Sequence, residues 1–494
     1  MTSALRIRPE DTVAVALEPL SAGSAVSVGG ATVTLKEDIT PGHKFALRDI
    51  KSGENVIKYG FPIGHATADI PAGSHVHIQN LKTNLSETLS YSWNPAAPAE
   101  LPKPEAKSFM GYPRRDGRTG IRNELWIIPT VGCVNDIARN LEREAQKFVG
   151  PSVDHVYAFT HPYGCSQMGD DQEHTRQILA DLATHPNAGG VLLLGLGCEN
   201  SSVAEVKKYM GNYDTSRVRA LICQEVEDEH ETAMKLLGEL AERMAEDRRV
   251  SCPASALVVG LKCGGSDGFS GITANPVIGG LSDRVAALGG STILTEVPEM
   301  FGAETILMSR CETVELFEKT VSLINDFKKY YQDNHQTIYE NPSPGNKAGG
   351  ISTLEDKALG CTQKSGFSPV KGVLAYGEKV EAPGLNLLSA PGNDLVASTA
   401  LASSGAQLVL FSTGRGTPFA SPVPTLKIAT NPTLAKKKAN WIDFAAGDLL
   451  AGKTLDELAD SLLDLVLEVA SGREVVSEKN GFHDLAIFKQ GVTL

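Results

Sequence analysis

The chain has 494 residues, a hydrophobic content of 41% and a formal net charge of −13 at neutral pH. At roughly 150 residues per domain, this length predicts about three domains. The acidic balance argues against nucleic acid as the main partner, because nucleic-acid binding needs a basic surface. No apolar stretch reaches the ~18 residues of a membrane span, and the N-terminus lacks a signal-peptide pattern. Eight scattered cysteines favour free or metal-bound thiols in a reducing, cytoplasmic compartment.

Residues 1–83 predict a small all-β module. Val13 and Val15 alternate with small residues, and Gly29-Gly30 separates two short β-type runs. Glycine tolerates the positive φ of tight hairpin turns, so this pair predicts a hairpin. Residues 84–110 include the proline-rich stretch NPAAPAELPKPEAK and predict a semi-extended linker.

From residue 111 the pattern is α/β, with buried strands alternating with amphipathic helices. Residues 229–247 carry an apolar stripe at helical spacing, and Thr454 with Glu457 forms a capping-box signature for a last strong helix. A boundary near residue 250 divides a middle domain, 111–249, from a C-terminal domain, 250–494. The runs that predict strands of a mostly parallel sheet are LWIIPTVG, VLLLGLG, ALVVGL, STILTEV, LNLLSAPG and LVLFSTG.

Seven polar Gly- and Pro-containing loops fall among these runs and predict one shared site, because ligands bind beyond the carboxyl ends of parallel strands. Cys165, Cys198 and Cys263 each follow a strand-like run, and LLLGLGC echoes LVVGLKC. Three thiolates suit iron or an iron–sulfur cluster. An oxygen-ligand alternative suits Mn²⁺ or Fe²⁺, and burial of each thiol as a small hydrophobe is the simpler interpretation. The oxygen set comprises Glu199, Asp267, Glu296 and Glu299.

Other polar residues suit acid–base chemistry or anion binding. His161 is a candidate base or ligand, with a hydrogen-bonded structural role as the alternative. Arg415, between two glycines, suits a carboxylate clamp or an ordinary surface loop. Lys347 and Lys262 are weaker point charges of the same kind. In the β module, His43-Lys44 lies in a Pro-Gly turn and His75 shares a strand face with His77; each pair alone is typical of solvated surface.

Stretches from residue 42 to the C-terminus resemble the altronate/galactarate dehydratase family. Among them are GHKFALRDI, YGCSQMGDD, GLGCEN, CGGSDGFSGITANP, YENPSPGNKAGG, FSTGRGTP and FKQGVTL. The resemblance implies an N-terminal β-clip module of the SAF type, a middle α/β domain often used for dimer contacts, and a C-terminal Rossmann-like domain. It further implies dehydration of a small sugar acid with a divalent metal, usually Fe²⁺ or Mn²⁺, in a homodimer without a membrane or nucleic-acid partner.

PTVGCVN, VPEMFGAE and LGCTQK favour altronate over galactarate within that family, with a 2-keto-3-deoxy acid as the product. A metal with cationic side chains would stabilise the enediolate formed when the proton beside the carboxylate is removed. The expected metal ligands are drawn from Cys165, Cys198, Cys263 and Glu199; the expected acid–base groups are His161, Asp267 and Lys262; and the expected substrate contacts are His43, Lys44, Asn346, Lys347 and Arg415.

Three other functions remain open on the sequence. Galactarate dehydration or sulfo-lyase chemistry on a related acid belongs to the same chemical class. A nicotinamide-dependent oxidoreductase is disfavoured, because GLGCEN carries Asn200 where a dinucleotide fingerprint needs a third glycine. A non-enzymatic sugar-acid binding protein is disfavoured by the many polar strand ends.

Overall fold

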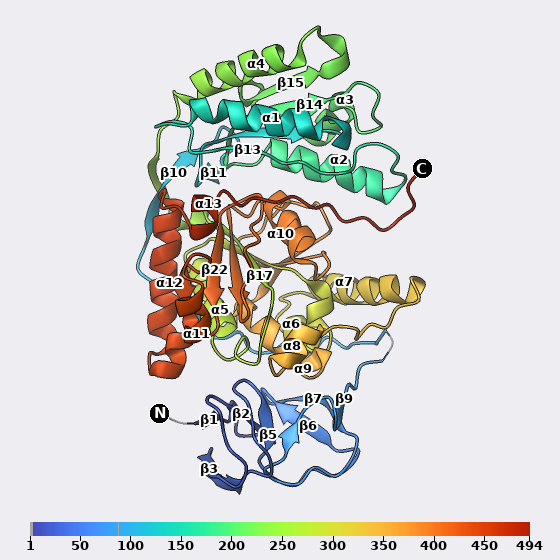
Figure 1. The fold of residues 1–494 in the computed structure, drawn as a ribbon, viewed down its shortest axis with the longest axis vertical. Helices are drawn as coiled ribbons and strands as arrows, with labels where there is room; N and C mark the ends of the chain where they lie inside the picture. Colours follow the sequence, from blue (N-terminus) through green and yellow to red (C-terminus); the bar gives the residue numbers. More distant parts are fainter. Residues whose placement is uncertain (1–2, 87) are drawn as a thin grey trace.

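The computed structural model describes residues 3–86 and 88–494. Three bodies are stacked along its long axis, with the β module at one end, the C-terminal domain in the centre and the middle domain at the other end (Figure 1). The connecting segment runs along the C-terminal domain, where the Tyr91 hydroxyl donates to Glu304 and Ala96 N–H donates to Ser309 O. Within the described ranges, no helix has the length and apolar character needed to cross a membrane.

The N-terminal module is all-β, as the sequence predicts. The predicted hairpin joins β3 (Ala25–Val28) to β4 (Ala31–Thr34), and both of its glycines, Gly29 and Gly30, have positive φ. The remaining strands form a four-stranded sheet of β1 (Ala4–Leu5), β2 (Val13–Ala16), β5 (Lys44–Ala46) and β8 (His75–Val76), and a three-stranded sheet of β6 (Asn55–Lys58), β7 (Phe61–Ala66) and β9 (Leu81–Lys82).

Buried charge joins the β module to helix α9 (Leu354–Cys361) of the C-terminal domain. Lys44 Nζ and Lys58 Nζ each lie 2.9 Å from a carboxylate oxygen of Asp356, and all three side chains are buried. Burial alone would raise the pKa of Asp356, but the two ammonium groups outweigh it and hold that pKa below its usual range. Loss of one partner from such a buried group costs several kcal/mol, so this junction is firmly held.

The middle domain is a parallel four-stranded sheet in the order β13-β12-β14-β15, covered by helices on both faces. Successive strand residues point to opposite faces, so Leu125 packs with α1 and α4 while Trp126 packs with α2 and α3. The strands are β12 (Glu124–Pro129), β13 (Val156–Ala158), β14 (Ala188–Gly195) and β15 (Val218–Ile222); the helices are α1 (Asn135–Ala145), α2 (Asp170–Ala183), α3 (Val203–Tyr209) and α4 (Glu229–Met244).

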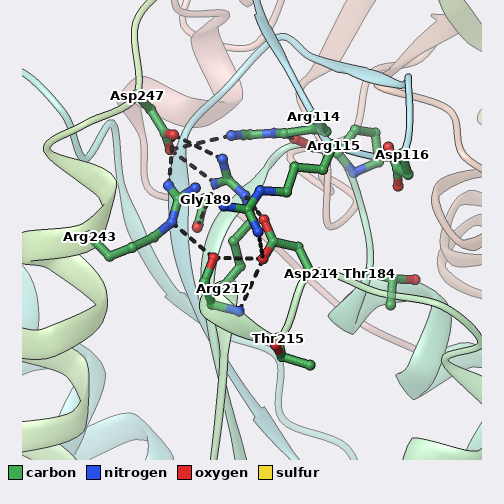
Figure 2. Close-up of polar contacts among 12 residues, drawn as sticks. Arg114, Arg115, Asp116, Thr184, Gly189, Asp214, Thr215, Arg217, Arg243 and Asp247 are labelled. Atoms are coloured by element: carbon green, nitrogen blue, oxygen red, sulfur yellow. Dashed lines mark hydrogen bonds and ion pairs between the residues drawn. The ribbon is translucent and has the colours of Figure 1, made fainter.

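An arginine–aspartate network closes one end of this domain (Figure 2). Asp247, just beyond α4, accepts hydrogen bonds from Arg114, Arg217 and Arg243. Arg114 follows β10 (Ser108–Pro113), which pairs with β11 (Thr119–Gly120) and β16 (Val250–Pro253) in a small antiparallel sheet. A cavity of about 100 Å³ beside the network is lined by two of these arginines, Arg114 and Arg217. Their guanidinium groups are paired with carboxylates, so the network holds the end of the domain together.

The C-terminal domain contains a parallel seven-stranded sheet. Leu410 faces a core formed with α5 (Ala274–Ala287) and α12 (Leu455–Ala470), while Val409 faces a core formed with α10 (Asp394–Ser403) and the middle domain's α2. The strand order is β19 (Val370–Leu374), β20 (Gly384–Leu388), β18 (Ser291–Leu294), β17 (Val258–Cys263), β21 (Leu408–Thr413), β22 (Thr425–Ala429) and β23 (Phe444–Ala445).

The α/β fold class and the predicted strands are confirmed, but one expectation about their arrangement is wrong. Each of the six predicted runs contains a strand, yet β12 and β14 belong to the middle sheet while β17, β18, β20 and β21 belong to the C-terminal sheet. The polar strand ends are therefore divided between two sheet edges. Hydrophobic periodicity identifies a buried strand but not the sheet in which it pairs.

Candidate active site

An open cleft of about 510 Å³ lies at the carboxyl ends of the C-terminal strands. Its floor is built from the end of β17, the turn after β18 and helix α9. Its wall is the segment that carries the short helix α8 (Pro344–Ala348). The polar residues that line it are Cys263, Glu299, Glu340, Asn341, Ser343, Asn346, Lys347, Lys357 and Asp394.

Two thiols and a carboxylate meet on the floor of this cleft. Cys263 Sγ lies 3.4 Å from Cys361 Sγ. Glu299 Oε2 lies 3.1 Å from Cys361 Sγ and 3.4 Å from Cys263 Sγ. The hydrogen bond to Cys263, followed by burial, raises the pKa of the Cys361 thiol well above its ordinary value, so that thiol stays protonated at neutral pH.

Three buried lysines surround these groups. Lys364 Nζ lies 2.9 Å from Cys263 Sγ and 3.0 Å from a carboxylate oxygen of Glu296. Burial favours the neutral amine, but the neighbouring thiol and carboxylates outweigh it and raise the pKa of Lys364 well above its usual range. The other two ammonium groups pair with acids in the same way: Lys262 with Glu296 at 2.5 Å and Asp394 at 2.8 Å, and Lys357 with Glu299 at 2.8 Å.

The three carboxylates match the three ammonium groups in charge. Burial alone would raise the pKa of Glu299, but Lys357, Lys262 and Lys364 outweigh it and lower that pKa. Glu296 holds its contacts from a backbone with φ of 69°, an uncommon conformation for a residue with a side chain. The floor of the cleft is thus a fixed array of charges, suited to stabilising charge that develops on a bound anion.

The wall of the cleft presents one free cation. Within the described residues, the Lys347 ammonium has no hydrogen-bond or ion-pair partner, and the side chain is half-buried at the cleft surface. Asn346 has a structural role: its Nδ2 donates to Ser266 O at 2.8 Å and its Oδ1 accepts from Ser343. Arg415 is exposed beside the same segment, where a Cβ on Gly345 would lie 3.6 Å from Arg415 Nε.

Asp267 has a structural position beside the cleft. Its carboxylate is buried and accepts hydrogen bonds from Ser270, Phe269 N–H, Thr430 and Asn431. Burial raises the pKa of Asp267 in spite of these donors. The carboxylate therefore ties the loop after β17 to the end of β22, and its oxygens are occupied by the protein.

The other predicted acid–base and thiol residues lie at the edge of the middle sheet. Both ring nitrogens of His161 are occupied, Nε2 by Pro129 O at 2.8 Å and Nδ1 by Tyr163 N–H at 3.2 Å, and burial lowers the pKa of His161 to about 4. Cys165 and Cys198 are exposed, with Sγ 3.5 Å from Asn200 Oδ1 in the first case. Glu199 accepts from Thr130 at 2.7 Å and from Gly197 N–H at 2.7 Å.

Three groups of potential metal ligands occur in the described residues, each with its ligand atoms within 4.8 Å of one another. One is the Cys263–Glu299–Cys361 floor of the cleft. Another, Glu124–His155–Glu478, already binds the Arg122 guanidinium, which lies 2.7 Å from Glu478. The third is His43–His75–His77 at the junction of the β module and the C-terminal domain. Cys165, Cys198 and Glu199 belong to none of these groups.

The structure thus brings together some of the predicted site residues and separates others. Lys262, Cys263, Asn346 and Lys347 meet at the cleft, and His43 and Lys44 contact the back of its wall through Ala348 O and Gly350 O. Three residues of this site were not among those predicted from the sequence: Lys357, Cys361 and Lys364. They lie on or just after α9 at positions i, i+4 and i+7, so they share one helical face, and that spacing was the available signal.

Known families match along almost the whole chain. The "Altronate/galactarate dehydratase SAF domain" matches residues 2–84, "D-galactarate dehydratase/Altronate hydrolase, second domain" matches 111–245, and "D-galactarate/Altronate dehydratase, C-terminal" matches 254–493.

Curated relatives extend the match over full lengths. "Altronate dehydratase" of Escherichia coli K12 is 54% identical over 493 residues, covering 99% of each chain. "Altronate dehydratase" of Bacillus subtilis 168 is 54% identical over 500 residues, covering 100% of each chain. "Galactarate dehydratase (L-threo-forming)" of E. coli K12 is 33% identical over 507 residues, covering 98% of this chain and 96% of the relative. The chain therefore belongs to the altronate/galactarate dehydratase family.

Proposed function

We propose that this chain is a hydro-lyase that removes water from D-altronate and gives 2-keto-3-deoxy-D-gluconate, a step of hexuronate breakdown. The observation that carries the proposal is the cleft at the carboxyl ends of the C-terminal strands, where ammonium and carboxylate groups face a space of sugar-acid size. Two full-length relatives at 54% identity bear the name altronate dehydratase, against 33% for the galactarate enzyme.

The cleft residues suit the two halves of this reaction. The unpaired Lys347 ammonium binds the substrate carboxylate, and Lys357 stabilises the negative charge of the enediolate. Cys263 lines the cleft and its Sγ lies 2.9 Å from the Lys364 ammonium, a setting that suits a thiolate which accepts the C2 proton. The Cys263 thiol formed in that step gives its proton to the departing C3 hydroxyl, which leaves as water.

The family resemblance also implies a divalent metal, Fe²⁺ or Mn²⁺. When bound, such an ion supplies a Lewis acid for the carboxylate and the leaving hydroxyl. Both the Cys–Glu–Cys floor and the three-histidine group offer donor types that first-row metals accept. We favour a mononuclear ion over an iron–sulfur cluster, because Cys165 and Cys198 lie on a different sheet from the two buried thiols of the cleft.

We further propose that the enzyme acts in the cytoplasm as a homodimer. All eight cysteines are free, which suits a reducing compartment. Dimer contacts through the middle domain are the expectation from the family resemblance, and sedimentation velocity would measure the mass in solution. A monomer at micromolar concentration would contradict this part of the proposal.

A substrate panel tests the activity. Anaerobically purified enzyme with added Fe²⁺ should convert altronate with a kcat/KM at least tenfold above those for galactarate and sulfolactate. The variant Asp267→Asn serves as a control for folding. Asp267 supports the cleft without facing it, so activity lost in this variant reports a disturbed fold and not a missing chemical group. Preference for galactarate or sulfolactate, or no turnover of any acid by folded, Fe²⁺-loaded enzyme, would reject the proposal.

A further inference from the structure

Three imidazoles converge where the β module meets the C-terminal domain. His43 precedes β5, while His75 and His77 lie at β8. Their ring centroids are between 5.0 and 5.4 Å apart, and His43 Nδ1 lies 3.0 Å from His75 Nε2. His43 and His77 are buried and His75 is partly buried. Two strands and the neighbouring domain thus hold three nitrogen donors in one small volume.

The outer nitrogens of these rings are held by other groups of the protein. His43 Nε2 lies 3.2 Å from Ala348 O, and His77 Nδ1 lies 2.9 Å from Ser352 Oγ. The remaining outer nitrogen, His75 Nδ1, lies 3.4 Å from Gln79 Nε2. His43 and His77 are thus oriented as metal-bound histidines are, with one nitrogen fixed by a carbonyl or hydroxyl and the other facing the centre of the group.

The second candidate group is less suited to a cation. Lys364 Nζ contacts Cys263 Sγ at 2.9 Å and Lys357 Nζ contacts Glu299 at 2.8 Å, so ammonium groups already contact two of its three ligand residues. Near the histidines, Lys44 Nζ is directed to Asp356 at 2.9 Å, a carboxylate that it shares with Lys58, and no ammonium group contacts an imidazole nitrogen in the described residues. The inner histidine nitrogens have only one another as partners among the described residues.

We propose that His43, His75 and His77 form a binding site for one first-row divalent ion such as Fe²⁺ or Mn²⁺. Imidazole suits these metals, and three protein ligands leave positions open for an oxygen ligand. His43 contacts Ala348, the neighbour of Lys347 in the cleft wall, so the site lies directly behind that wall. The role of the ion in dehydration rests on the proposed function, whereas the binding site rests on the geometry alone.

Cobalt substitution tests the site without reference to activity. Metal-stripped enzyme is titrated with Co²⁺ under anaerobic conditions, and bound cobalt is measured together with the absorption spectrum. One Co²⁺ per chain should bind, with visible ligand-field bands and no thiolate-to-cobalt charge-transfer band. A strong charge-transfer band would place the ion on the cysteines and overturn the proposal, as would a failure of the wild-type chain to bind cobalt.

Matched variants locate the ligands. His77→Ala and His75→Ala should each lower Co²⁺ affinity at least 100-fold, and Ser352→Ala should lower it about 10-fold through the outer contact. Cys361→Ser, a donor of the other group, and His65→Ala, a half-buried histidine of the same module outside the group, should bind Co²⁺ like the wild type. Circular dichroism and thermal unfolding check each fold. Loss of cobalt from Cys361→Ser with retention in His77→Ala would refute the site.

The dehydratase activity and the three-histidine metal site can each be rejected independently of the other. Wild-type enzyme that binds cobalt through nitrogen ligands yet turns over no altronate would keep the metal site and reject the activity. Turnover of altronate by His77→Ala enzyme that has the wild-type metal content would keep the activity and reject the site.

Discussion

The strands β14 and β17 end in nearly the same letters, LLLGLGC and LVVGLKC, but their cysteines have opposite environments. Gly197, before Cys198, has φ of 129°, and the chain leaves the sheet so that the thiol is exposed. Lys262, before Cys263, is buried between Glu296 and Asp394, and β17 continues to the cysteine. The residue before each cysteine thus accompanies the difference: a glycine precedes the thiol in the surface loop, and a buried lysine precedes the thiol in the floor of the cleft.

The two sheet edges also differ in what neighbouring elements bring to them. At Cys263, helix α9 and the turn after β18 add two lysines and two glutamates. At Cys198, the nearest side-chain partner is Gln224, at 3.9 Å. A polar strand end becomes a candidate site only where other elements add buried charge, and four predictions test this difference.

Replacement of the two cysteines should give the largest contrast. Cys263→Ala should lower kcat on altronate by about 10²- to 10⁴-fold, the usual contribution of a positioned acid or base. Cys198→Ala should remain within about twofold of the wild type, because its thiol is exposed at the other sheet edge. Steady-state assays on both folded variants measure this, and similar losses in the two variants would contradict the comparison.

Replacement of one glutamate at each edge should affect stability unequally. Glu296→Gln leaves the buried Lys364 and Lys262 ammonium groups short of charge, and loss of one partner from such a pair costs about 3–5 kcal/mol. Glu199→Gln keeps its size and loses only part of its backbone hydrogen bonding, about 1 kcal/mol. Chemical denaturation compares them, and a larger loss in Glu199→Gln would reverse the expected order.

Acid should weaken the fold in part through His161 of the middle domain. The folded-state pKa of His161 is about 4, below the ordinary value near 6.5, so the unfolded chain takes up the proton first. Its contribution is complete above pH 6.5 and is lost as pH falls toward 4, by about 2 kcal/mol at pH 5. His161→Gln should reduce the slope of unfolding free energy between pH 7 and 5. Equal slopes in wild type and His161→Gln would contradict the assignment.

Substitution at the cleft wall should give the smallest effect. Lys347→Ala removes an unpaired ammonium at the cleft surface and should raise KM for altronate about 10-fold with little change in kcat. Arg415→Ala, beside the same wall but exposed, should change KM less than about threefold. Initial-rate measurements compare the two variants. A larger effect of Arg415→Ala would indicate that the substrate carboxylate binds at the rim of the cleft, beside Arg415.

Local patterns in the sequence predicted much of the fold. The Gly29-Gly30 hairpin, the six buried strands and the Thr454–Glu457 capping box depend on neighbours a few residues apart, and all are present. The pairing of those strands in two sheets depends on contacts between residues dozens to more than a hundred positions apart, and no local period encodes it.

The site was predictable only in part for the same reason. The glycines around Cys263 follow a strand-like run, so their position at a sheet edge could be anticipated, and Lys347 was predicted from its Gly- and Pro-rich loop. The charge array requires α9 to bring Lys357 and Cys361 against Glu299, which lies about sixty residues earlier in the chain. The sequence does not show that His43 and His77 lie side by side. Their proximity follows only from the folding of two strands against the segment that carries Ser352.

A crystal structure of the Fe²⁺-loaded enzyme with altronate, trapped in the Cys263→Ala variant, tests the central claim most directly. The account predicts the sugar acid in the cleft, with its carboxylate on Lys347 and its C2 facing the position of the missing thiol. Density for altronate beside Cys198 at the middle sheet, with the C-terminal cleft free of substrate, would contradict it.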